Sequence, residues 1–210
     1  MATAAHTPGA CLVVGMLATA LAGPAKAAEP LRVNVMVQNS VGLPEADILQ
    51  AQAVAGRLYR AINIEITWIG VDGPLVALDQ EERSAFLRSV LRLNLVEPDF
   101  EKLARPEAAL GVAYPEARVA SILVGRIRDD RGIPAFIPLD DRIGFVIAHE
   151  IGHLLGFRRH SVKGLMALRL DWMAVSQDCL WFTNGEALVI RHEYVDLMTR
   201  RNALTLLDVR

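Results

Sequence analysis

The strongest constraint on this chain is a run of five residues, His149-Glu150-Ile151-Gly152-His153. The residues around it, from Asp140-Asp141 to Leu155, have the apolar spacing of a helix, and either aspartate is a suitable N-cap. Because residues four apart lie on one face of a helix, both imidazoles can bind one zinc ion. Glu150 is offset by one position, so its carboxylate can reach a metal-activated water without being a ligand. The run therefore predicts a catalytic zinc site on one helix.

The residues after this helix can supply the rest of a metal site. Gly156 follows where the helix must stop and the chain turn back, a position that favours a residue tolerating positive φ. His160 comes next and can provide a third imidazole. We interpret Ser161 as a turn-stabilising hydroxyl, because no base is arranged beside it as a nucleophile would require. Met166 closes a turn with the sequence Lys163-Gly164-Leu165-Met166.

These residues together carry a family resemblance. The run HEIGHLLGFRRHS over residues 149–161, followed by GLM at 164–166, resembles the metzincin pattern of two helical histidines, a glycine turn, a third histidine and a methionine turn. It is similar in particular to small exported bacterial proteins of that type, which also carry a nearby tryptophan, here Trp172. The usual metzincin spacing would place the third histidine at Arg159, so His160 requires a loop that is one residue longer.

The resemblance implies a zincin-like α+β fold and a zinc metallopeptidase. His149, His153 and His160 would bind Zn²⁺, and Glu150 would act as general base in the hydrolysis of peptide bonds by metal-activated water. Met166 would form an apolar floor beneath the zinc without binding it. The expected substrate is a polypeptide, which an endopeptidase of this kind could receive by strand addition along residues 119–127 if they lie at the edge of the cleft.

Periodicity predicts a twisted mixed sheet of about four strands, followed by a mainly helical C-terminal lobe. Alternating or β-rich segments predict strands at 31–37, 64–68, 91–96 and 119–127, and apolar residues at helical spacing predict helices over 44–62 and 79–89. The first strand-helix-strand unit favours a parallel pair. Gly125 is expected to mark a bulge or an edge, and residues 97–118, which contain Pro98, Pro106 and Pro115, are expected to be irregular.

We interpret the N-terminus as a signal peptide. Residues 11–22 form an apolar run too short to span a bilayer comfortably, and Ala25-Lys26-Ala27 fits a cleavage site. An uncleaved anchor is the alternative, because no Lys or Arg precedes the run. We expect residues 1–27 to be removed and the protein to be periplasmic or secreted. Residues 28–210 would then form one metallopeptidase domain, with an N-terminal lobe to about 156 and a C-terminal lobe from about 157.

The charge of the chain argues against two classes of partner. With 22 Lys and Arg against 24 Asp and Glu, the net charge is -2 and there is no basic cluster. A protein of this kind lacks the electrostatic footprint that nucleic-acid binding requires. We therefore expect no nucleic-acid partner and no stable membrane association after signal cleavage.

Other metal-binding residue types are better explained by structural roles. Glu186 could be a metal ligand like the later glutamate of gluzincins. The last helix, however, is predicted to begin with a capping box formed by Thr183-Asn184-Gly185-Glu186, and that role already explains the acid. Cys179 and His192 have no partner at ligand spacing, which favours structural roles for both. Cys179 is also the one cysteine left after signal cleavage, so no internal disulfide is possible.

Two alternatives to a peptidase remain. A zinc-stabilised binding protein would keep the fold without turnover, although a structural zinc site has no use for Glu150 beside its ligands. Hydrolysis of a non-protein amide, such as a cell-wall cross-link, would use the same chemistry as peptide hydrolysis.

Overall fold

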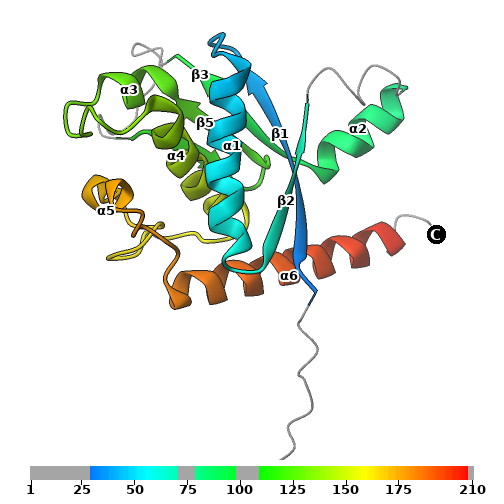
Figure 1. Cartoon of the computed structure of the whole chain (residues 1–210). Coiled ribbons are helices and arrows are strands. Elements are labelled where there is room, and N and C mark those ends of the chain that lie inside the picture. Colours follow the sequence, from blue (N-terminus) through cyan, green and yellow to red (C-terminus); the bar gives the residue numbers. More distant parts are fainter. Residues whose placement is uncertain (1–28, 71–78, 98–108, 208–210) are drawn as a thin grey trace, which may run out of the picture.

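The computed structural model describes residues 29–70, 79–97 and 109–207 (Figure 1). The predicted signal peptide, residues 1–27, lies outside these ranges. The elements are β1 (Leu31–Asn39), α1 (Glu45–Arg60), β2 (Ile64–Ile69), α2 (Gln80–Ser89), β3 (Leu91–Val96), β4 (Gly111–Tyr114), β5 (Val119–Leu123), α3 (Val124–Asp129), α4 (Leu139–Leu154), α5 (Trp172–Ser176) and α6 (Asn184–Leu207). Over the described ranges, no helix combines the length and the apolar character needed to cross a bilayer.

The strands form one mixed sheet of five strands in the order β2-β1-β3-β5-β4. β1 runs parallel to β2 and β3, β3 runs parallel to β5, and β4 is antiparallel to β5. The α+β class, the mixed sheet and the parallel β1–β2 pair are therefore confirmed. The additional strand is β4, which lies in the segment that its prolines predict to be irregular. A strand of four residues is too short for its period-two alternation to be distinctive.

The strand predicted over residues 119–127 is wrong in its second half. β5 ends at Leu123 and α3 begins at Val124, so Gly125 is buried in a short helix and marks no bulge. A short apolar run is compatible with a buried strand or a buried helix turn, and its periodicity cannot separate the two. β5 also lies between β3 and β4, so this segment does not provide the sheet edge that strand addition requires.

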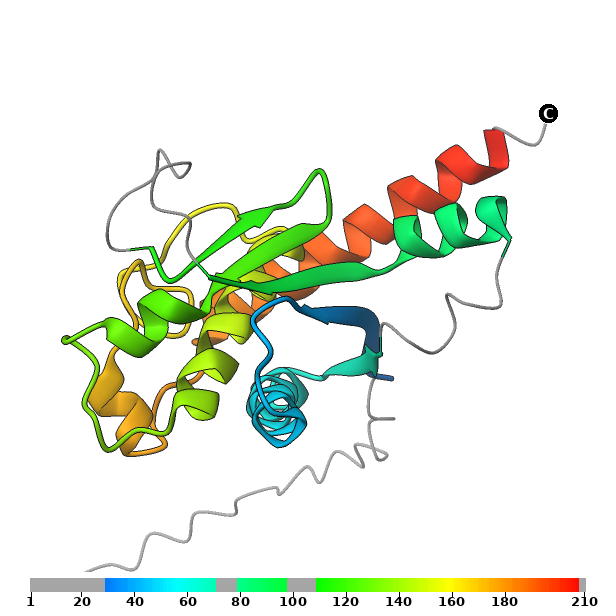
Figure 2. The same ribbon diagram turned by 90° about the horizontal axis from the view of Figure 1, so that it is seen from above.

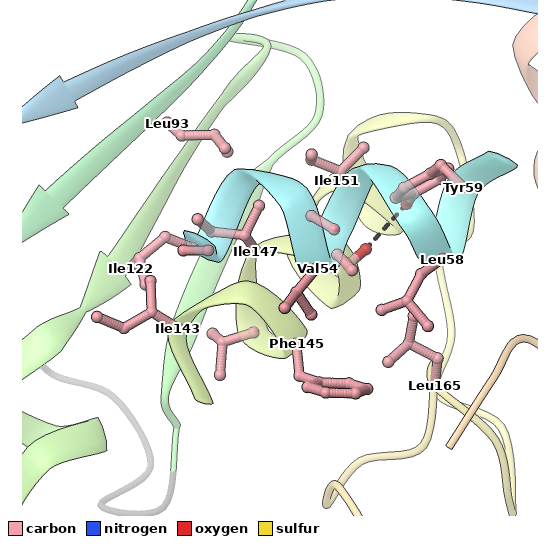
Figure 3. Packing of buried hydrophobic residues seen from close by; sticks show 14 of the residues in the cluster. Val54, Leu58, Tyr59, Leu93, Ile122, Ile143, Phe145, Ile147, Ile151 and Leu165 are labelled. Atoms are coloured by element: carbon pink, nitrogen blue, oxygen red, sulfur yellow. Dashed lines mark hydrogen bonds between the residues drawn. The ribbon is translucent and has the colours of Figure 1, made fainter. Parts of the chain in front are cut away.

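Helices α1 and α4 lie side by side against one face of the sheet (Figures 1 and 2). They approach closely at Gly144 of α4, where a Cβ atom would lie 2.7 Å from Cβ of Val54 on α1. The core lies between these helices and the strands. Its buried side chains include Leu58, Leu93, Ile122, Ile147 and Ile151 (Figure 3). This layer fixes the position of α4, which carries the HExxH motif.

The start of α4 differs from the sequence-based expectation. The helix begins at Leu139 after Pro138, and no side chain caps it. Asp140 and Asp141 lie in the first turn instead, where negative charge interacts favourably with the helix dipole. Pro138 stands at the N-cap position with its φ fixed by the proline ring, and the helix begins directly after it. The prediction of an aspartate cap is therefore wrong.

Candidate metal centre

The end of α4 bends sharply enough to return the chain towards its own last turn. Gly156 has φ of 108°, and its N–H donates to the carbonyl of His153 at 3.1 Å, while the N–H of Phe157 donates to Gly152 at 3.0 Å. These two bonds form a Schellman motif, which favours glycine at this position. A side chain at 156 would also lie 2.6 Å from Cβ of Glu193. The turn brings the Phe157 carbonyl beside the ring of His153.

Backbone carbonyls fix the tautomers of the two motif histidines. Nδ1 of His149 lies 2.7 Å from the Leu165 carbonyl oxygen, and Nδ1 of His153 lies 2.5 Å from that of Phe157. A carbonyl can only accept, so Nδ1 of each neutral ring carries the proton and Nε2 carries a lone pair. This arrangement is the usual outer support of a metal-binding histidine.

The two Nε2 atoms lie only 3.1 Å apart. Because neither of them carries a proton in the neutral rings, this contact cannot be a hydrogen bond. Two nitrogens bound to one tetrahedral zinc at about 2.0–2.1 Å would lie about 3.3 Å apart. The donor pair therefore fits a shared cation.

His160 joins this pair despite its longer loop. Its ring centroid lies 5.3 Å from that of His149 and 5.0 Å from that of His153. One ring nitrogen from each histidine lies within 4.8 Å of the other two. Over the described ranges, this is the one group of three or more His, Cys, Asp or Glu side chains placed to share a metal ion. Cys179 and His192 are both exposed and lie outside it.

Loss of solvent around the site lowers the pKa of all three imidazoles, although His160 is itself exposed. The pKa of His149 is lowered to about 4: burial is the largest cause, the hydrogen bond to Leu165 opposes it, and the neighbouring His153 and His160 add to the lowering. Burial also lowers the pKa of His153 and of His160. A neutral imidazole can bind a metal without first losing a proton. At neutral pH the three nitrogens are therefore ready to act as ligands.

Glu150 is buried between α4 and the edge strand β4. It is 5% exposed, and a Cβ atom at Gly111 would lie 2.6 Å from its Oε1 and 2.7 Å from its Cγ. Burial, followed by the charge of Glu150, raises the pKa of Tyr59, whose hydroxyl donates to the Ala148 carbonyl at 2.9 Å. Gly111 therefore provides the space for this carboxylate. No pattern in the sequence distinguishes Gly111 from the other glycines.

Met166 is fully buried against α4. Its Sδ and Cε atoms occupy the space that a side chain at Gly152 would need. Gly152 lies between the two motif histidines in sequence, so the methionine packs against the turn that carries them. Trp172 is partly buried against the hydrophobic core, in agreement with a packing role.

Glu186 forms the predicted capping box and also reaches the loop that follows His160. The Thr183 N–H donates to its Oε2 at 2.7 Å, and its own N–H donates to Oγ1 of Thr183 at 3.2 Å. Its Oε1 accepts from the Met166 N–H at 2.9 Å and from the Ser161 hydroxyl at 2.5 Å. The capping role is confirmed, whereas the contacts to residues 161 and 166 have no signal in the sequence.

Comparison with known proteins identifies no family for this chain. No family model matches the chain, and no curated protein matches it. Among solved structures, the archaemetzincin of Methanopyrus kandleri is similar with a TM-score of 0.46 and 15% sequence identity, over 78% of this chain and 95% of that chain. The geometry of the three histidines remains the basis for a functional assignment.

Proposed function

We propose that this chain is a zinc-dependent metallopeptidase with His149, His153 and His160 as zinc ligands. The observation that carries the proposal is the distance of 3.1 Å between Nε2 of His149 and Nε2 of His153. Hydrogen bonds to backbone carbonyls keep the proton of each ring on Nδ1, so both Nε2 atoms present lone pairs. A cation between these lone pairs replaces repulsion with two coordinate bonds. A third imidazole completes a ligand set that suits zinc and leaves a position open.

Glu150 is the residue that makes the site a candidate enzyme. When bound, zinc would supply Lewis-acid activation of a water and of a substrate carbonyl. The Glu150 carboxylate would take a proton from the attacking water and later give it to the leaving amine. It is adjacent to a ligand in sequence and held against β4 by burial, so its position is defined before substrate binds. These are the properties expected of a general base rather than of a surface carboxylate.

An extended polypeptide is the substrate that the sheet favours. Over the described ranges, β4 pairs with β5 alone and is the edge of the sheet next to Glu150. An exposed strand edge binds a peptide through main-chain hydrogen bonds. We therefore assign strand addition to β4 in place of residues 119–127. Export after removal of residues 1–27 belongs to the same proposal, since an exported peptidase would act on polypeptides outside the cytoplasm.

Glu150→Gln tests the proposal most simply. Glutamine keeps the size of the side chain but cannot take the proton, so we expect zinc content to stay at the wild-type level and peptide cleavage to fall by about 100-fold or more. The measurement is digestion of a peptide library by zinc-loaded wild type and variant, each with its zinc content determined. Glu65→Gln, on the exposed surface of β2 at the opposite sheet edge, is the matched control and should cleave like wild type.

Two outcomes would contradict the proposal. If Glu150→Gln cleaved peptides at the wild-type rate, Glu150 would not be the general base. If wild type bound zinc but cleaved nothing in the library, a zinc-stabilised binding protein or a hydrolase of a non-protein amide would replace the peptidase.

A further inference from the structure

Glu186 has more hydrogen-bond partners than a helix cap requires. It is 2% exposed, and a capping box uses one carboxylate oxygen, here Oε2 with the Thr183 N–H. The other oxygen, Oε1, accepts from Ser161 and from Met166, which lie at the two ends of the turn after His160. A buried carboxylate is retained only where such donors compensate for its desolvation. The second set of contacts therefore calls for a role beyond capping α6.

One peptide group connects Glu186 to His149. The N–H of Met166 donates to Oε1 of Glu186 at 2.9 Å, and the carbonyl of Leu165, which belongs to the same peptide group, accepts from Nδ1 of His149 at 2.7 Å. Because the peptide group is planar and rigid, fixing its N–H also fixes the direction of its carbonyl. A carboxylate on the N–H further polarises the carbonyl and strengthens its bond to the imidazole.

Ser161 connects the same carboxylate to His160. Its hydroxyl lies 2.5 Å from Oε1 of Glu186 and 2.8 Å from the Lys163 carbonyl, and its N–H donates to the Met166 carbonyl at 2.9 Å. The hydroxyl is the donor, and its contact with the carboxylate is the shorter of the two. The residue next to His160 is thus tied to the residue next to Leu165.

Gly164 shows how closely the carboxylate covers this turn. It has φ of 93°, and a side chain there would collide with Oε2 of Glu186 and lie 2.7 Å from Cγ2 of Thr183. The turn and the start of α6 therefore pack without room for a side chain between them.

We propose that Glu186 is a positioning residue of the metal centre. It acts on His149 through the Leu165–Met166 peptide and on His160 through Ser161, and it binds no metal itself. The inference rests on the proposed zinc site. Groups that orient metal ligands from outside typically change metal affinity by about 10- to 100-fold when removed, so the effect should be measurable without any substrate.

Three variants separate positioning from capping. Glu186→Ala removes both roles, and Ser161→Ala removes one contact on the metal side. Thr183→Ala removes the hydrogen bond from the Glu186 N–H and leaves the carboxylate contacts in place. Zinc affinity of the full-length protein is measured by competition with a chelator, and the free energy of unfolding is measured separately on chelator-treated protein.

We expect Glu186→Ala to weaken zinc binding by about 10-fold or more and Ser161→Ala to weaken it less. Thr183→Ala should lower stability while changing zinc affinity by less than about threefold, because a lost cap affects mainly folding. Ser161→Ala should have a smaller effect on zinc affinity in the Glu186→Ala background than in wild type, since both changes remove the hydrogen bond between Ser161 and Glu186.

The inference is overturned if Glu186→Ala binds zinc as tightly as wild type, or if Thr183→Ala weakens zinc binding equally. If Glu186→Ala does not fold, the comparison of Ser161→Ala with Thr183→Ala decides, and equal zinc affinities would overturn it. Wild type that binds no zinc would instead contradict the proposed function, so the two failures are distinguishable.

Discussion

Gly111 determines where the proposed general base can lie. A Cβ atom at this position would come within 2.9 Å of three atoms of the Glu150 side chain. Glutamate is flexible, so a methyl group would move the carboxylate rather than break the strand. The position of the Glu150 side chain on α4 therefore depends on the absence of a side chain at position 111 of β4.

Gly111→Ala should reduce peptide cleavage without removing zinc. A displacement of a catalytic group by about 1 Å can cost about 100-fold in rate, and we expect a loss of about 10- to 100-fold here. Rates and zinc content are compared with those of Gly70→Ala, where a Cβ atom would meet nothing within 4 Å. A wild-type rate in zinc-loaded Gly111→Ala would show that Glu150 is not held in place by this contact.

The sequence predicts the histidines and the glutamate of the site, but not what orients them. His149, Glu150 and His153 are predictable because helical spacing alone sets their relative positions. The bond of His153 to Phe157 is local and follows from the glycine turn. The bond of His149 to Leu165 spans 16 residues, and its direction depends on a turn held from another helix. Contacts of this kind require the tertiary structure.

At the level of elements, the packing of α1 against α4 fixes the distance of α4 from the sheet. Gly144 allows the close approach, since its missing side chain leaves room for Val54 and for the Ala51 carbonyl. Tyr59, further along α1, donates to the Ala148 carbonyl one residue before the motif. The two helices are therefore in contact beside the site as well as in the core (Figure 3).

Gly144→Ala should destabilise the protein. Its Cβ atom would lie 2.7 Å from Cβ of Val54 and 2.8 Å from the Ala51 carbonyl oxygen, neither of which can move without shifting α1. We expect a loss of about 1–3 kcal/mol in the free energy of unfolding, which exceeds the gain of about 1 kcal/mol in helix propensity. Urea denaturation measures it. Gly185→Ala, where a Cβ atom meets nothing within 4 Å, is the control and should not be destabilised; equal stabilities of the two variants would contradict the packing argument.

Element boundaries show where periodicity fails as a guide. The helices predicted over residues 44–62 and 79–89 agree with α1 and α2. The first has a long amphipathic pattern, and the second is opened by a capping box between Asp79 and Glu82. The boundary between β5 and α3 has no such signal, because Val124 and Ile127 are buried in the helix as they would be in a strand. Similarly, β4 is recognisable only from its pairing with β5.

At the scale of the whole molecule, α6 connects the loop of residues 161–166, which follows His160, to the sheet. Glu186 in its first turn holds residues 161 and 166, while Tyr194 donates to the Arg32 carbonyl at 2.7 Å and Arg191 to the Ile62 carbonyl at 3.1 Å. The helix passes along one end of β1 and β2 (Figure 1). The position of α6 depends on the strand order β2-β1-β3-β5-β4. That order is set by pairing between strands far apart in the sequence, which no local pattern encodes.

The central claim is that three imidazoles hold one metal ion, and the zinc content of the purified chain tests it most directly. Wild type should contain about one zinc ion per chain at neutral pH, and His149→Ala, His153→Ala and His160→Ala should each retain much less after dialysis. His192→Ala, which changes an exposed histidine outside the cluster, should retain the wild-type amount. Wild type without zinc, or a His160→Ala variant that keeps its full zinc content, would contradict the claim.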